Sequence, residues 1–134
     1  MYSAEELMKQ AARARQRAYA PYSHYKVGAC LLSRDGRLFL GCNIENAAYG
    51  PSVCAERVAL FGAVAQGCRD FAAIAIVGGP QDCPEEALPS AYPCGVCRQV
   101  LAEFCPPELP VYCGRPGAIE AFTLGELLPK SFGL

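Results

Sequence analysis

Two short cysteine-bearing runs constrain the fold of this chain more than any other feature of its sequence. Cys54 precedes Glu56 by two residues, and Cys94 and Cys97 lie three residues apart. Two cysteines at that spacing can bind one metal ion from a single helical turn, and a third from elsewhere completes three ligands. A catalytic zinc ion typically takes three protein ligands and leaves its fourth position to water. The fold is therefore expected to bring the two runs together.

Glu56 is placed to act on that water rather than to bind the metal. A site that activates water and protonates a leaving group needs a proton carrier, and positioned acid–base groups contribute on the order of 10²–10⁴ in rate. The alternative is an ordinary glutamate in the first turn of a helix, where its charge is favourable without a catalytic role. We favour catalysis, so the two runs predict a zinc-dependent hydrolase or deaminase.

Two other uses of paired cysteines are less consistent with the sequence. A structural zinc site needs a fourth ligand, and the chain has a single histidine, His24, although another cysteine can supply it. A thioredoxin-like dithiol leaves the Cys54-Ala55-Glu56 run unexplained. A catalytic site with three thiolate ligands therefore remains the preferred interpretation.

Three thiolates on Zn²⁺ carry a net charge of −1, which weakens the metal as a Lewis acid unless a cation offsets it. Helix N-termini favour the thiolate form, and all three cysteines lie at expected helix starts. Arg57 and Arg98 each follow a cysteine run and are candidates to donate hydrogen bonds to the sulfurs. Arg57 is the better candidate because it lies one turn into the metal-facing helix, although a surface arginine is the simpler alternative.

Composition limits the class of protein. At 134 residues, we expect one domain over residues 1–134, and 52% hydrophobic residues exclude disorder. A net charge of −1 without a basic tract argues against a nucleic-acid polymer as partner. There is no membrane-spanning run or secretory segment, and the odd count of nine cysteines favours a reducing cytoplasm. The apolar excess suggests self-association through a buried interface.

Hydrophobic periodicity and turn residues predict an α-β-β-α-β-α-β-β-α order. Ser3 and Glu6 form a capping box for a first helix that we expect to reach about Tyr19. The remaining expected elements are strands over Lys26–Ser33, Arg37–Cys42, Phe71–Val77, Leu109–Cys113 and Ala118–Thr123, and helices over Cys54–Gln66, Cys94–Phe104 and a short stretch after Thr123. This order implies an α/β fold, a three-layer α-β-α sandwich around one mixed five-stranded sheet.

Five stretches of the chain form a pattern that is highly specific in combination, although no single stretch is: Pro21–Ala29, Gly41–Ala47, Cys54–Arg57, Pro93–Val100 and Glu126–Gly133. Through these stretches the chain resembles the small homotetrameric cytidine deaminases nearly end to end. The resemblance implies one zinc ion per subunit, held by Cys54, Cys94 and Cys97, with Glu56 as the proton shuttle. It also implies hydrolysis of cytidine and 2′-deoxycytidine to the uridine nucleosides and ammonia, as in pyrimidine salvage.

The resemblance further implies roles for residues that contact the substrate. Asn43 and Glu45 are expected at the ribose hydroxyls, the backbone of Ala55 and the Glu56 carboxyl at the pyrimidine edge, Tyr25 over the base, and Tyr49 and Phe132 at pockets of neighbouring subunits. From the residues alone, a loop in which the Asn43 and Glu45 side chains hydrogen-bond within their own segment explains these residues equally well. A lone aromatic such as Tyr25 is more often part of a core.

Two positions depart from the family pattern. Tyr25 stands where phenylalanine is common, and Tyr92 stands where serine is frequent, after a proline-rich loop. Both departures bear on fine specificity rather than on the zinc ligands. Three rival functions remain: a polynucleotide-editing deaminase, which Glu45 disfavours because it repels a 3′-phosphate; a deaminase of a related aminopyrimidine nucleoside analogue; and a non-enzymatic zinc-stabilised interaction domain.

Overall fold

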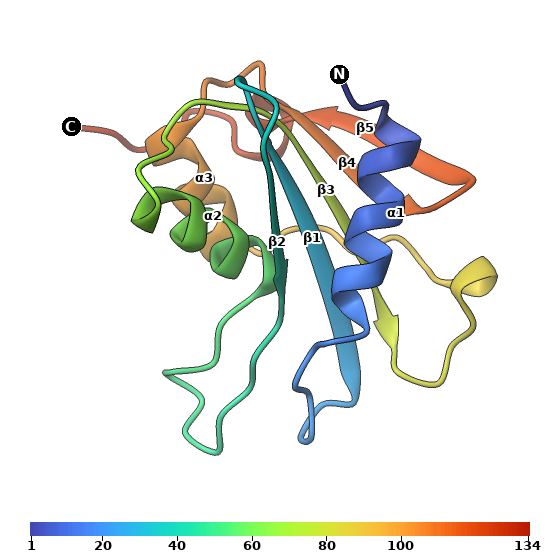
Figure 1. Ribbon diagram of the computed structural model, residues 1–134. Coiled ribbons are helices and arrows are strands. Elements are labelled where there is room, and N and C mark those ends of the chain that lie inside the picture. Colours follow the sequence, from blue (N-terminus) through green and yellow to red (C-terminus); the bar gives the residue numbers. More distant parts are fainter.

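The computed structural model describes all residues from Met1 to Leu134 and has the element order expected from the sequence (Figure 1). Its helices and strands are α1 (Ala4–Arg15), β1 (Tyr25–Ser33), β2 (Leu38–Cys42), α2 (Ala55–Ala65), β3 (Phe71–Pro80), α3 (Gly95–Phe104), β4 (Pro110–Arg115), β5 (Ala118–Thr123) and α4 (Leu124–Leu127), with a 3₁₀ turn at Glu85–Ala87. None of the helices has the length and hydropathy needed to cross a membrane.

The five strands form one mixed sheet in the order β2-β1-β3-β4-β5. β1 is antiparallel to both β2 and β3, β3 is parallel to β4, and β5 is antiparallel to β4. It follows that β2, β3 and β4 run in the same direction, with α2 and α3 as the crossovers between them. Both crossover helices begin at the carboxyl edge of these strands, where α/β sheets usually bind ligands. The topology therefore brings the two cysteine runs to one edge.

Because successive side chains of a strand point to opposite faces of the sheet, the buried residues form two hydrophobic layers. On β1, Ala29 and Leu31 belong to the core under α2 and α3, whereas Cys30 and Leu32 pack in the core under α1. Figure 1 shows α1 on one face of the sheet and α2 with α3 on the other. The predicted three-layer sandwich is confirmed. β3 is buried on both faces, as its continuous apolar run predicts.

Two predicted boundaries were wrong because tertiary pairing replaces local propensity. The first helix ends at Arg15 rather than Tyr19, since the Tyr19 backbone bonds instead to Asn43 and Glu45 of the loop after β2, at 3.0 and 2.9 Å. β3 continues past Val77 to Pro80 because these residues pair with β1. A Cβ on Gly79 would lie 2.6 Å from the Leu88 side chain, so glycine lets the loop after β3 pack directly on the strand.

The N-terminal helix also fixes the strand ends next to the carboxyl edge of the sheet. The buried Arg15 guanidinium donates to the carbonyl of Lys26 at 2.9 Å and to those of Gly79 and Pro80 at 3.0 and 2.7 Å. Three carbonyls on one buried cation satisfy most of its donors, as burial of a charge requires. Arg15 thereby ties the beginning of β1 to the end of β3.

Candidate metal and catalytic site

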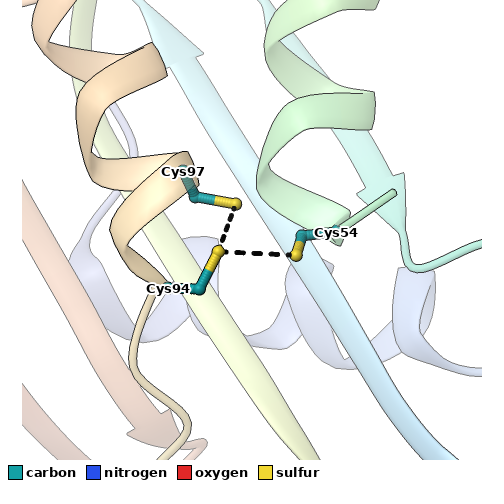
Figure 2. A group of neighbouring side chains, drawn as sticks. All are labelled: Cys54, Cys94 and Cys97. Carbon is teal, nitrogen blue, oxygen red and sulfur yellow. Dashed lines mark hydrogen bonds between the residues drawn. The ribbon is translucent and has the colours of Figure 1, made fainter. Parts of the chain in front are cut away.

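Three cysteine side chains converge at the helix N-termini (Figure 2). Cys54 is the N-cap of α2, Cys94 is the N-cap of α3, and Cys97 lies in the first turn of α3. The Sγ atoms of Cys54 and Cys94 are 3.8 Å apart, those of Cys94 and Cys97 are 3.5 Å apart, and all three lie within 4.8 Å of one another. None of the nine cysteines forms a disulfide.

This donor set fits a zinc ion. Tetrahedral Zn–S bonds of about 2.3 Å place the sulfur atoms about 3.8 Å apart, close to the separations found here. The helix N-terminus and Arg57 place positive charge beside the Cys54 sulfur, which favours its thiolate form. The pKa of Cys54 is lowered to about 5, first by a hydrogen bond from Cys97 and then by Arg57. The same hydrogen bond, in which Cys97 keeps the proton, raises the pKa of Cys97.

The two arginines that follow the cysteine runs have different partners. Arg57 donates from Nη2 to the Cys54 Sγ at 3.4 Å, and this contact raises the pKa of its guanidinium. Its Nε is buried without a hydrogen-bond partner. Arg98 instead donates to the carbonyl oxygens of Pro93 and Leu127, both at 2.7 Å. Arg57 is thus the cation beside the sulfurs, whereas Arg98 holds the segment leading into α3 against the C-terminal region.

Glu56 lies in the first turn of α2 with only 4% of its surface exposed. Burial raises the pKa of its carboxyl to about 7, and the neighbouring charge of Cys54 adds to this effect. A carboxyl that titrates near neutral pH can accept a proton in one step and donate it in the next. The residue therefore has the properties of a general acid–base group, beside the three sulfur atoms.

A cavity of about 630 Å³ opens next to the sulfurs, and its size suits a small organic ligand. Two of the three cysteines and most of the substrate residues expected from the resemblance line it: Tyr25, Asn43, Glu45, Cys54, Ala55, Glu56, Arg57 and Cys94. The structure therefore gathers residues from β1, the loop after β2 and both helix N-termini around one space.

The sequence reasoning missed part of the cavity lining. The additional residues are apolar or small side chains: Ser23, Val27, Ser52, Val53, Ile76, Ser90 and Ala91. Tyr92, which the sequence already singles out for specificity, lines the cavity as well. Val27 follows Tyr25 by two residues on β1, so strand alternation alone places both on one face. Ser90 and Ala91 offered only the weaker signal of lying a few residues before Cys94. Their position depends on how the loop after β3 folds over the sheet.

Asn43 and Glu45 line the cavity while also holding the loops around it. The Asn43 amide accepts from the backbone N–H of Val27 and donates to the carbonyl of Tyr25, both at 2.8 Å. Glu45 accepts from the backbone N–H groups of Tyr22 and Ser23 at 3.0 and 3.1 Å and from the Ser23 hydroxyl. Hydrogen bonding by Ser23 lowers the pKa of Glu45, which favours its charged form.

Tyr49 and Phe132 do not reach the cavity. Tyr49 lies in the loop before α2 with 85% of its surface exposed, and Phe132 lies in the C-terminal tail with 72% exposed. The Phe132 carbonyl accepts a hydrogen bond from the Gln99 side chain at 3.1 Å, which anchors the tail on α3. Tyr49 instead lines a separate hollow of about 330 Å³ together with Ser23 and Glu45.

The fold and the site define a class: an α/β/α protein whose helix N-termini present three thiol ligands and a buried carboxyl to a ligand cavity. The family model of the cytidine and deoxycytidylate deaminase zinc-binding region matches residues 1–113. The chain therefore belongs to the cytidine and deoxycytidylate deaminase family and has the family's zinc-binding region.

Individual relatives agree with this assignment. A cytidine deaminase of Halalkalibacterium halodurans is 50% identical over 127 residues, covering 94% of this chain and 91% of the relative. A cytidine deaminase of Sporosarcina psychrophila is 46% identical over 129 residues, covering 96% and 90%. The crystal structure of a cytidine deaminase from Burkholderia pseudomallei superposes with a TM-score of 0.88 at 46% identity, covering 98% of this chain and all of the other.

Proposed function

We propose that this protein is a zinc-dependent cytidine deaminase that hydrolyses cytidine and 2′-deoxycytidine to uridine and 2′-deoxyuridine, with release of ammonia. The observation that carries the proposal is the convergence of the three cysteine sulfurs with the buried Glu56 beside a cavity of nucleoside size. The similarity to cytidine deaminases over nearly the whole chain supports the substrate.

Cys54, Cys94 and Cys97 would hold the zinc ion, and Arg57 would offset the third thiolate through its hydrogen bond to Cys54. When bound, zinc supplies a Lewis acid that lowers the pKa of water. Glu56 accepts a proton from the attacking water and delivers it to N3 of the base, while the water oxygen forms a bond to C4. Glu56 then takes the remaining proton from the new C4 hydroxyl group and delivers it to the 4-amino nitrogen, and the C4–N bond breaks to leave the uracil carbonyl and ammonia.

The loop and strand residues would hold the nucleoside. Glu45 is charged and accepts hydrogen bonds from hydroxyl groups, and the Asn43 amide keeps one N–H and one lone pair beyond its bonds to β1. The Tyr25 ring supplies a face for the base. The backbone of Ala55, at the first position of α2, joins Glu56 in reading the pyrimidine edge.

We further propose that residues 1–134 form one domain that assembles as a cytoplasmic homotetramer, in which Tyr49 and Phe132 close cavities of neighbouring subunits. Large apolar side chains remain exposed on β2, α2 and α3, namely Leu40, Phe61 and Val96. Single exposed apolar residues are common, but Phe61 and Val96 lie on the two helices that cover one face of the sheet, and Leu40 lies on the edge strand β2. The nine free thiols are compatible with a reducing compartment.

A substrate panel tests the proposal. Ammonia release and the change in ultraviolet absorbance should be measured with cytidine, 2′-deoxycytidine, cytosine, dCMP, blasticidin S and single-stranded DNA. We expect turnover of the two nucleosides to exceed that of every other compound. Faster turnover of blasticidin S would assign the chain to an analogue deaminase, faster turnover of single-stranded DNA to a polynucleotide deaminase, and no ammonia from any compound to a non-enzymatic role.

A further inference from the structure

The cavity wall next to Cys94 is held from outside the cavity by the edge strand β5. Ser90, Ala91 and Tyr92 line the cavity, and Tyr92 lies two residues before Cys94. The Ser90 hydroxyl donates to Glu120 Oε1 at 2.5 Å, and the Tyr92 hydroxyl donates to the same oxygen at 2.7 Å. Glu120 itself does not line the cavity. One carboxylate oxygen on β5 therefore fixes both ends of this three-residue wall.

A second contact on β5 fixes the plane of the Tyr92 ring. Phe122 lies two residues after Glu120, so strand alternation puts both on the same face of β5. The Phe122 ring packs edge-on against Tyr92, with centroids 5.9 Å apart and an interplanar angle of 75°. A phenol held at its hydroxyl and at its ring edge has little rotational freedom left. Tyr92 contributes to the cavity lining from this fixed position.

The rest of this loop is anchored independently of Glu120. Leu88 is buried in the core under α1, and its carbonyl accepts from Arg115 Nη1 on β4 at 2.9 Å. Removal of Glu120 would therefore release residues 90–92 without detaching the loop from the sheet. Because Glu120 is exposed on an edge strand, its substitution costs little core packing.

The position of the wall determines what it contacts, given the proposed function. The thiol ligands and Glu56 act on C4 of the base, so the 4-amino group lies at the metal end of the cavity, beside Cys94. Tyr92 lines the same cavity two residues before Cys94, which is the N-cap of α3. We infer that Glu120 is a positioning residue that holds the Ser90–Tyr92 wall against the 4-amino group and thereby excludes pyrimidine nucleosides with a substituted 4-amino nitrogen.

The experiment compares kcat/KM for cytidine and for its 4-methylamino analogue, both of which yield uridine. In the zinc-loaded wild-type chain we expect a strong preference for cytidine. Tyr92→Phe should reduce that preference by about two- to tenfold, the effect of one hydrogen bond of about 0.5–1.5 kcal/mol. Glu120→Ala, which also releases Ser90, should reduce it by at least as much. The double variant should reduce it no further than Glu120→Ala alone, because Glu120→Ala already breaks the hydrogen bond that Tyr92→Phe removes.

Glu108→Ala is the matched control, since Glu108 is an exposed carboxylate with no hydrogen bond in the structure, and its preference should equal that of the wild type. Thermal unfolding of each variant separates loss of the contact from loss of the fold. An unchanged preference in both single variants, or effects that add in the double variant, would overturn the inference while leaving the proposed function intact. A wild-type chain that deaminates neither nucleoside contradicts both.

Discussion

The two sides of the cavity are built in different ways. On the side of α2 and α3, the chemical groups lie at helix starts and are held by the core: Ala55 and Cys97 are fully buried and Glu56 nearly so. On the side of β1 and the loop after β2, Tyr25 is exposed, Asn43 and Glu45 are half-buried, and hydrogen bonds to neighbouring backbone hold both polar side chains. Packing positions the helix side, whereas polar contacts position the loop side.

This difference has a physical consequence. A buried helix terminus fixes atoms to within the tolerance that metal ligands and proton transfer demand, since close-packed interiors resist displacement. A loop held by a few hydrogen bonds can adjust as a ligand enters. Substitutions on the helix side should therefore affect metal binding and kcat, whereas substitutions on the loop side should chiefly affect KM.

The largest effect is expected from loss of a metal ligand. Cys94→Ala should abolish both zinc binding and turnover, because two thiolates do not complete the three-ligand site. Cys94 is exposed, so the chain should still fold. Metal analysis and cytidine turnover on the same preparation check this. The control is Cys83→Ala, which removes a cysteine of the loop after β3 and should retain both. Stoichiometric zinc with activity in Cys94→Ala would mean that the ligand set is wrong.

A smaller effect on the same side should come from Arg57→Gln. This substitution removes the cation that donates to the Cys54 sulfur, and partners of metal ligands typically contribute about 10–100-fold to metal affinity or activity. Competition with a chelator measures the affinity, and initial rates measure kcat. Arg69→Gln, at an exposed arginine without a hydrogen-bond partner, is the control. Equal zinc affinity and kcat in the two variants would show that the sulfur contact has no electrostatic role.

On the loop side, Asn43→Ala should raise KM more than it lowers kcat. It breaks the bonds to Val27 and Tyr25, each of about 0.5–1.5 kcal/mol, and removes a side chain that we propose holds the ribose. Steady-state kinetics with cytidine separate the two constants. Asn46→Ala is the matched control, because the side-chain Oδ1 of Asn46 accepts only from the backbone N–H of Ala48 within its own loop. A fall in kcat at unchanged KM would contradict the division between the two sides.

The smallest functional effect should come from the C-terminal capping box. Thr123 accepts from the backbone N–H of Glu126 at 3.2 Å, and the Glu126 side chain accepts from the Thr123 N–H at 2.9 Å. Thr123→Ala should lower the free energy of unfolding by about 0.5–2 kcal/mol. Denaturant unfolding measures this, and zinc content and kcat should stay at the wild-type level. A loss of zinc would mean that α4 supports the metal side directly.

The same contrast explains what the sequence could predict. The ligand spacing, the helix starts at Cys54 and Cys94, and the buried strand β3 follow from local patterns, so the fold and the cysteine cluster were accessible. The sequence also singled out Tyr92 for specificity, but it did not indicate the contacts that hold the Ser90–Tyr92 wall in place. The positions of Ser90 and Tyr92 depend on hydrogen bonds to Glu120, which lies thirty residues after Ser90 in the sequence. Glu120 reaches them only because β5 pairs with β4. Local periodicity carries no information about such a contact.

The early end of α1 has the same origin. Tyr19 has a sequence compatible with continued helix, yet its backbone forms hydrogen bonds with Asn43 and Glu45. Those bonds also bring the loop after β2 next to the turn that precedes β1, where Glu45 meets Ser23. The end of α1, which local propensity predicts wrongly, is therefore where the loop side of the cavity is held together.

The most direct test of the central claim is Glu56→Gln, with zinc content and cytidine turnover measured on one sample. The amide preserves the shape of the buried side chain but cannot carry a proton between water, ring nitrogen and leaving amine. We expect stoichiometric zinc together with a loss of turnover on the order of 10²–10⁴. Near-normal turnover with zinc retained would contradict the role of Glu56 as proton carrier, and loss of zinc would mean that Glu56 supports the metal instead.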